Sequence, residues 1–446
     1  MKKNNTYVFT CALIAALGGL LFGFDTAVIS GAEKSIQEMF GLDGFWHGFT
    51  VAIALIGTIV GAMTAGKPAD KYGRKSVLIV IAVIYGMTAL ATAVADDWLV
   101  FISFRFVGGI GVGASSVIGP MYIAEIAPAH LRGRLVGMFQ LNVVSGILLA
   151  FFSNYLISSV VEVDAWRWML GVQALPAFIF FALLFYIPST PRLLVLKGRS
   201  KEALGLLNKL ASRDPENELK EIEESLQGDN AASSANLFAK EYRLPVILAI
   251  LVAVFNQMSG INAIMYYAPR IFEMTGFGKD DALLQSVTIG ATNFIFTMLA
   301  MTVIDKFGRK KLLLIGSIGM MAFLGMVAKT LFEGSTGNIL VVVYLVGFIA
   351  FFAFSQGAVI WVFISEIFPN KIRAKGQALG SFTHWIMAAM VSWMFPAIAE
   401  SGANGGGVAF MIFSVAMLVQ LIVVFKFFPE TKGKSLEQIQ KELKQA

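Results

Sequence analysis

Long apolar stretches separated by short polar segments run through almost the whole chain. A transmembrane helix needs about 20 mostly apolar residues, and twelve stretches of about that length can be recognised. We therefore predict an all-α membrane protein with twelve transmembrane helices, at approximately 7–30, 47–66, 76–95, 98–123, 135–160, 166–187, 245–272, 283–304, 312–331, 339–364, 374–399 and 406–428.

The composition and the placement of charge agree with this pattern. Of 446 residues, 57% are hydrophobic and 14% are charged, against about 25% charged in soluble domains. The net charge of +6 does not indicate a nucleic-acid partner, because the basic residues gather in alternate loops: Lys67, Lys71, Arg74, Lys75, Arg132, Arg134, Lys306, Arg309, Lys310, Lys311, Lys371, Arg373 and Lys375. The intervening loops are acidic and are expected to contain Glu33, Glu38, Asp43, Asp96, Asp97, Glu162, Asp164, Asp280, Asp281, Glu333 and Glu400. This asymmetry predicts that both termini and the 188–244 segment are cytoplasmic.

Two motifs occur twice. DKYGRK at 70–75 returns as DKFGRK at 305–310, and AEIAPAHLRG at 124–133 returns as SEIFPNKIRAKG at 365–376. The repeat predicts two pseudo-symmetric six-helix bundles, with a binding site between them near the middle of the membrane. We expect bundles at 1–187 and 245–428, a cytoplasmic helical linker at 188–244 and a cytoplasmic tail helix at 429–446.

Polar segments outside the bundles carry helix-start signals. Ser200 can cap one linker helix, and Asp214 followed by Pro215 favours the start of another. Ser435 and Gln438 have the spacing of a capping box for the tail helix. These helices are interpreted as structural clamps, and a regulatory or partner-binding role is the alternative.

Several motifs together resemble the sugar porter family of the major facilitator superfamily, and most of all its bacterial proton–sugar symporters of the xylose–proton type. They are GGLLFGFDTAVISG (18–31), GKPADKYGRK (66–75), RFVGGIGVG (105–113), PMYIAEIAPAHLRG (120–133), WRWMLG (166–171), NQMSGINAIMYYAP (256–269), DKFGRKK (305–311), SEIFPNKIRAKG (365–376) and PETKGKS (429–435). The likeness covers nearly the whole chain. It departs from the family pattern at PSTPR (188–192), which lacks the usual glutamate, at Asn256 and at His384.

Amide and indole side chains inside the predicted spans are candidates for sugar recognition, since an amide both donates and accepts hydrogen bonds. The resemblance implies substrate contact by Gln140, Gln257, Asn262, Asn293, Trp361 and Trp385, with Asn256 and His384 as further candidates at positions that depart from the pattern. Hydrogen bonding between helices is the alternative for the amides, and packing is the alternative for the tryptophans. His384 also adds a titratable group near the predicted site.

The spacing of Gln257 and Asn262 predicts a broken helix. Five residues correspond to about 140° of rotation on a regular helix, so both could not comfortably face one ligand. Ser259 and Gly260 lie between them and permit a break, as in other transporters. Tyr266 and Tyr267, just beyond, resemble the family's extracellular gate; interfacial packing is the alternative.

Asp25 is an acid within an apolar span, where a charge costs about 2.5–3.5 kcal/mol on insertion scales. By resemblance it matches the acid of the proton-coupled members, and Arg105 matches its basic partner. Protonation of Asp25 would release Arg105 and bias the conformational equilibrium. A permanent structural salt bridge is the alternative.

The repeated cytoplasmic charges have a second interpretation besides orienting the chain. By resemblance they bridge the two bundles and latch the outward-facing state. The residues assigned to this gate are Asp70, Arg74, Glu125, Arg132, Asp305, Arg309, Glu366 and Arg373.

These observations predict a monomeric importer of a monosaccharide, pentose or hexose, that moves with a proton by alternating access in a bacterial inner membrane. The expected partners are the sugar, the proton and lipid. We predict no cofactor, no metal site and no enzymatic activity, because no catalytic triad, metal cluster or nucleotide loop is recognisable. An uncoupled uniporter is the nearest alternative, followed by a sugar sensor that does not transport and by a drug–proton exporter.

Overall fold

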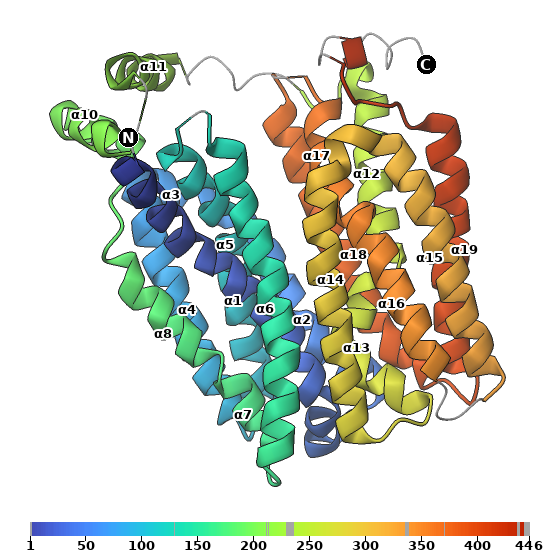
Figure 1. The fold of residues 1–446 in the computed structure, drawn as a ribbon. Helices are drawn as coiled ribbons and strands as arrows, with labels where there is room; N and C mark the ends of the chain where they lie inside the picture. The colour runs from blue at the N-terminus through green and yellow to red at the C-terminus, as the bar shows by residue number, and fades with distance from the viewer. Residues whose placement is uncertain are drawn as a thin grey trace. The chain divides into compact units, whose positions relative to one another are not determined.

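The computed structural model describes residues 2–128, 130–210, 212, 214–228, 236–334, 339–369, 371–434 and 438–440. Within these ranges every regular element is a helix (Figure 1). The first half and the linker contain α1 (Lys2–Phe40), α2 (Gly44–Thr64), α3 (Gly66–Tyr72), α4 (Arg74–Ala93), α5 (Trp98–Ile126), α6 (Arg132–Val160), α7 (Ala165–Gly171), α8 (Ala174–Leu184), α9 (Pro191–Leu196), α10 (Ser200–Lys209) and α11 (Pro215–Gly228).

The second half begins with a short 3-10 turn, η2 (Lys240–Tyr242). It continues with α12 (Arg243–Met258), α13 (Ile261–Met274), α14 (Lys279–Phe307), α15 (Arg309–Phe332), α16 (Ile339–Phe354), α17 (Gln356–Ile367), α18 (Arg373–Ala399) and α19 (Gly405–Phe427).

Twelve helical stretches of the described chain are long and apolar enough to cross a membrane, which confirms the predicted number of spans. Three of these stretches contain interruptions. The sixth consists of α7 and α8, the seventh of α12 and α13, and the tenth of α16 and α17, which separate at Ser355. Only the interruption in the seventh was expected from the sequence.

The first helix is longer than predicted, and this corrects the assignment of Glu33 and Glu38 to a loop. It continues beyond the apolar run to Phe40, and Gly41 follows with φ +61°. Ala32 and Ile36 extend its buried face by one turn each. Glu33 is consequently a buried helical residue, 1% exposed.

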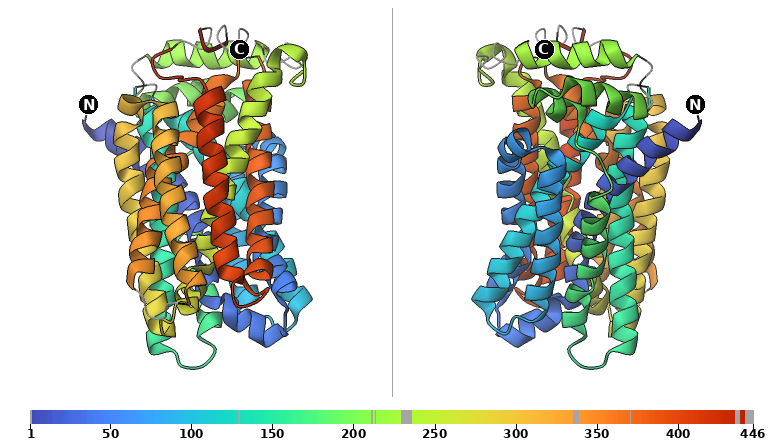
Figure 2. Two further views of the ribbon diagram at one scale, coloured as in Figure 1. Left: turned by 90° about the vertical axis from the view of Figure 1, so that its right-hand side faces the viewer. Right: turned by 90° about the vertical axis from the view of Figure 1, so that its left-hand side faces the viewer.

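The helices group into two compact units, neither of which is a continuous segment of chain. The first unit comprises 1–26, 56–150 and 167–234, and within it α4 packs against α5 and α8. The second comprises 27–55, 151–166 and 235–446. In the second unit α15 lies beside α16 and α19, and α12 lies beside α18 (Figures 1 and 2). The unit bounds differ from the bundle bounds expected at 1–187 and 245–428, which remain a prediction.

The helix-start residue was predicted correctly for one linker helix and incorrectly for the other. Helix α11 begins at Pro215, and the Asp214 carboxylate accepts a hydrogen bond from the Asn217 amide, as Asp–Pro predicts. Ser200 is not the cap of α10, because Arg199 occupies that position. The Ser200 hydroxyl instead donates to Glu223 Oε1 at 2.8 Å. Ser435 of the expected tail capping box lies outside the described residues.

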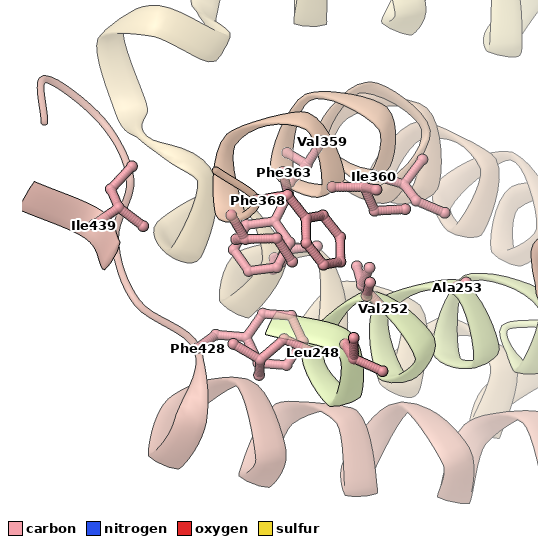
Figure 3. Packing of buried hydrophobic residues seen from close by; sticks show 14 of the residues in the cluster. Leu248, Val252, Ala253, Val359, Ile360, Phe363, Phe368, Phe428 and Ile439 are labelled. Carbon is pink, nitrogen blue, oxygen red and sulfur yellow. The ribbon is translucent and has the colours of Figure 1, made fainter. Parts of the chain in front are cut away.

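One apolar cluster in the second unit includes a residue of the tail. Phe363 of α17 stacks on Phe428 with ring centroids 5.0 Å apart, and Leu248 of α12 lies close by (Figure 3). Ile439 belongs to the same cluster and is 1% exposed. Burial of a large aliphatic side chain stabilises by about 1.5–3 kcal/mol, so this contact holds the described part of the tail to the helices.

Candidate substrate and proton-coupling sites

The predicted helix break is confirmed between α12 and α13. Helix α12 ends at Met258, and Gly260 adopts the left-handed conformation with φ +82°. A Cβ at position 260 would lie 2.4 Å from the Phe413 ring, so glycine is required by both conformation and space. The break lets Gln257 and Asn262 face each other across two helix ends.

A cluster of polar side chains fills this break. The Asn262 amide donates to Gln257 Oε1 at 2.8 Å, and Gln257 Nε2 donates to Asn256 Oδ1 at 2.9 Å. His384 of α18 completes the cluster, with both ring nitrogens 3.3 Å from Gln257 Nε2. The acceptors and donors of the cluster are thus directed at one another, which keeps buried amides satisfied. A ligand with several hydroxyls could replace these contacts one by one.

Two tryptophans flank the histidine. The Trp361 and Trp385 rings each lie 4.9 Å from the His384 ring, measured between centroids. Trp385 is buried, whereas Trp361 is 39% exposed. The structure therefore gathers six of the eight candidate sugar residues in one place: Asn256, Gln257, Asn262, Trp361, His384 and Trp385.

No hydrogen bond or ring contact of the described residues joins the other two candidates to this cluster. Asn293 is buried on α14 and, among the described residues, makes no hydrogen bond to this cluster. Gln140 lies on α6 in the first unit, where its side chain is exposed.

The two tyrosines of α13 occupy an irregular part of that helix. Tyr267 departs from helical geometry at φ −122° and ψ 19°, and Pro269 follows, which removes a backbone donor. Both tyrosines are buried, and the Tyr267 hydroxyl donates to the Ser392 carbonyl at 3.1 Å. The kink separates the C-terminal end of α13 from the part that carries Asn262.

Asp25 and Arg105 form a buried ion pair inside the first unit. Arg105 Nη1 lies 3.1 Å from Asp25 Oδ1, and the residues are 4% and 8% exposed, respectively. Arg105 Nε is buried without a hydrogen-bond partner in the described chain. Thr88, Thr92 and Gln173 line a small adjoining cavity. The contact is a single hydrogen bond rather than a bidentate pair, so few interactions are lost when it opens.

The charges of the repeated motifs in the first unit converge on Arg74. Its Nη1 lies 2.8 Å from Asp70 Oδ1, and its Nε lies 2.8 Å from Glu125 Oε1. The expected i,i+4 pair is therefore present, together with a longer-range pair to α5. Arg132 is exposed at the start of α6.

The corresponding charged residues of the second unit have different partners. Arg309 pairs with Glu366, with Nη2 to Oε1 at 2.8 Å and Nε to Oε2 at 3.1 Å. Thr431 also donates to Glu366 at 2.6 Å. Arg373 donates to the Phe368 carbonyl at 3.4 Å. The side chain of Asp305 lies outside the described part of the structure.

A further charged network escaped the sequence analysis. It joins Glu33 and Gln37 of α1, His47 of α2, Arg270 of α13 and Glu400 at the end of α18. Glu33 and Glu400 were assigned to loops, and His47 and Arg270 were not singled out. The uninterrupted helical spacing of Ala32, Ile36 and Phe40 was the available signal, because it places Glu33 inside a helix.

A helical protein with twelve candidate spans, a broken helix lined by amides and a buried ion pair belongs to the class of polytopic membrane transporters. The chain is a member of the sugar (and other) transporter family, whose model matches residues 11–443. It has the major facilitator fold.

Curated relatives and solved structures match over nearly the full length. The chain is 36% identical to the arabinose-proton symporter of Bacillus subtilis, over 98% of this chain and 95% of that protein. It is also 36% identical to the D-xylose-proton symporter of Escherichia coli, over 98% and 96%. The inward-open structure of the E. coli xylose transporter XylE matches with a TM-score of 0.87 and 34% identity, over 98% and 100%.

Proposed function

We propose that this chain imports a monosaccharide together with a proton by alternating access. The observation that carries the proposal is the cluster of Asn256, Gln257, Asn262 and His384 at the break between α12 and α13. Amides and an imidazole in a helix break offer donors and acceptors to a ligand with several hydroxyls, and Trp361 and Trp385 offer flat faces to its C–H groups. The similarity to arabinose- and xylose-proton symporters supports the same substrate class.

Asn293 and Gln140 are proposed to complete the sugar site. Both carry amides within the spans, and both match the family positions. In this scheme the sugar replaces the mutual hydrogen bonds of the cluster, so its hydroxyls leave no amide unpaired.

Asp25 and Arg105 are proposed as the proton-coupling pair. When Asp25 is ionised the pair holds; when Asp25 takes a proton, its attraction to Arg105 falls and the helices that carry the two residues are released. The buried, single hydrogen bond supports this assignment. The proton then moves down its gradient with the sugar.

The two gates are proposed to act at opposite ends. Tyr266 and Tyr267 close the extracellular path by movement of the kinked end of α13. The cytoplasmic residues Asp70, Arg74, Glu125, Arg132, Asp305, Arg309, Glu366 and Arg373 latch the outward-facing state. We further propose a monomer in the inner membrane, with both termini in the cytoplasm, that carries out no covalent chemistry.

Proton coupling is tested with Asp25→Asn in proteoliposomes. We expect uphill accumulation of labelled sugar to be lost while counterflow exchange is retained, because exchange needs the site but no gradient. Asp281→Asn, at an exposed position in the first turn of α14, is the matched control and should keep both activities. Unchanged accumulation by Asp25→Asn would identify a uniporter.

Sugar binding is tested with Gln257→Ala and Asn262→Ala. We expect at least about tenfold weaker binding, since each substitution leaves ligand or protein polar groups unpaired. Asn208→Ala in the exposed part of the linker is the control. A panel of unlabelled pentoses and hexoses in competition identifies the preferred sugar. Retained affinity in both cluster variants would place the site elsewhere.

A further inference from the structure

The Glu33 carboxylate is the centre of a buried network at the end of α1 farthest from the N-terminus. Arg270 Nε donates to Glu33 Oε1 at 2.9 Å, and Arg270 Nη2 forms an ion pair with Oε2 at 2.8 Å. His47 Nε2 lies 2.6 Å from the same Oε2. Arg270 also reaches Glu400 at 2.5 Å and Gln37 at 2.5 Å.

This network connects the first two helices of the chain with two helices of its second half. Glu33 comes from α1 and His47 from α2, both in the 27–55 segment, whereas Arg270 comes from α13 and Glu400 from the end of α18. Arg270 follows the kink at Tyr267 by three residues. The ion pair therefore holds the movable end of α13 against the first two helices of the chain.

Burial makes these contacts expensive to break one at a time. The side chains of Glu33, His47 and Arg270 are 2%, 0% and 12% exposed. A buried charge that loses its partner keeps its desolvation cost. Lys34 and Glu273 join the same two helices, α1 and α13, but Lys34 is 56% exposed, and such surface pairs contribute little.

His47 and the neighbouring charges lie against the same network. The Tyr267 ring, at the kink of α13, contacts the His47 imidazole edge to face, with centroids 5.9 Å apart. Glu38, Lys34, Glu273 and Lys279 line a cavity of about 220 Å³ beside Glu33 and Arg270. Opening this end of the molecule would therefore require the buried contacts of Glu33 to part.

We propose that Glu33, His47 and Arg270, with Glu400, form a lock that closes the extracellular gate. The inference rests on the proposed transport function, which identifies this end of the helices as the extracellular one. Opening toward the medium would then require Arg270 to leave Glu33 and Glu400.

Thiol labelling in intact cells tests this lock without requiring transport. The reporter is Ser30→Cys, because Ser30 is 2% exposed and lines the cavity beside Glu33; the native thiol is removed by Cys11→Ser. A membrane-impermeant maleimide is added outside. Val163→Cys, at a 76% exposed position between α6 and α7, supplies the reference rate. If Val163→Cys is not labelled, the proposed topology is contradicted. If it is fully labelled, a slow rate at position 30 reports the closed lock.

Arg270→Gln should raise the labelling rate of the reporter about tenfold at neutral pH, because the closed state loses its central ion pair. Lys34→Gln is the matched control on the same helix pair and should change the rate less than about twofold. If Arg270→Gln does not accumulate in the membrane, Glu400→Gln breaks the outer arm of the network and should raise the rate severalfold. Equal rates in the lock and control variants would overturn the proposal.

Discussion

The two turns that follow the second and eighth spans have nearly identical backbones but different partners. Gly73 between α3 and α4 has φ 92° and ψ 151°, and Gly308 between α14 and α15 has φ 88° and ψ 159°. Only glycine adopts this region readily. The repeated DKxGRK motif therefore specifies the same turn twice.

The charges around the turns differ. In the first unit Arg74 is held by Asp70 and Glu125. In the second unit the segment after α19 takes part: Glu430 accepts from the backbone amides of Arg309 and Lys310, at 2.9 and 3.2 Å, and Thr431 donates to Glu366. A carboxylate at a helix N-terminus is favourable because it satisfies free amides and the helix dipole.

A single residue accounts for much of this difference. The segments PST at 188–190 and PET at 429–431 are 241 positions apart. Glu125 and Glu366 of the repeated motif are separated by the same number of residues. Ser189 thus takes the place that Glu430 has in the second half. The comparison teaches that a repeated motif determines the backbone of a local turn. The residues that hydrogen-bond to the turn can nevertheless differ, and in the second half they connect the turn to the segment after α19.

The largest expected effect is the loss of either arginine. Arg74→Met should lower the free energy of unfolding by about 3–5 kcal/mol, because Glu125, whose side chain is only 17% exposed, is left unpaired. Arg309→Met should cost less, about 2–3 kcal/mol, since Thr431 still donates to Glu366. Chemical unfolding of the purified protein in detergent measures both. The control is Lys71→Met at an exposed position, and a larger loss in Arg309→Met than in Arg74→Met would contradict the comparison.

The next effect comes from the glycines. Alanine at position 73 or 308 should cost about 1–3 kcal/mol for the backbone conformation alone. The added Cβ would meet Leu193 Cδ2 at 2.3 Å in the first turn and Glu430 Oε2 at 2.5 Å in the second. Gly308→Ala should therefore lose more, because it displaces the carboxylate that caps α15. Gly66→Ala meets nothing within 4 Å and should be neutral in the same unfolding assay.

Removing the charge of Glu430 should have a smaller effect. We expect Glu430→Gln to lower the stability by about 1 kcal/mol, because the amide oxygen still accepts a hydrogen bond but no longer opposes the helix dipole. The midpoint of thermal unfolding at low salt is the measurement, and the difference should shrink as salt is added. Ser189→Ala is the comparison and should change the midpoint less; equal shifts would show that Glu430 adds nothing.

The smallest expected effect is a gain. Ser189→Glu places in the first half the residue that the second half already has, close to Leu193 and the turn at Gly73. An added carboxylate near the start of α4 should stabilise by a few tenths of a kcal/mol, up to about 1. The same thermal assay detects it, with Ser189→Gln as the uncharged control. A lower midpoint would mean that the two turns differ in more than this position.

The sequence predicted the polar cluster at the break between α12 and α13 better than it predicted the network around Glu33. The broken helix followed from the five-residue spacing of Gln257 and Asn262 and from Gly260, all of which are local. Glu33 and Arg270 are 237 positions apart, and no local pattern relates them. An acid at the edge of an apolar run was therefore assigned to a loop, although its helix continues.

By itself the sequence determined the twelve spans, the repeat, the family and the turn glycines, because apolar length and backbone conformation are properties of short segments. The tertiary structure alone decided which charges meet: Arg309 with Glu366, and Glu33 with His47 and Arg270. An ion pair inside a membrane protein depends on which helix faces converge and how far they are removed from water, and both are settled only when the helices pack.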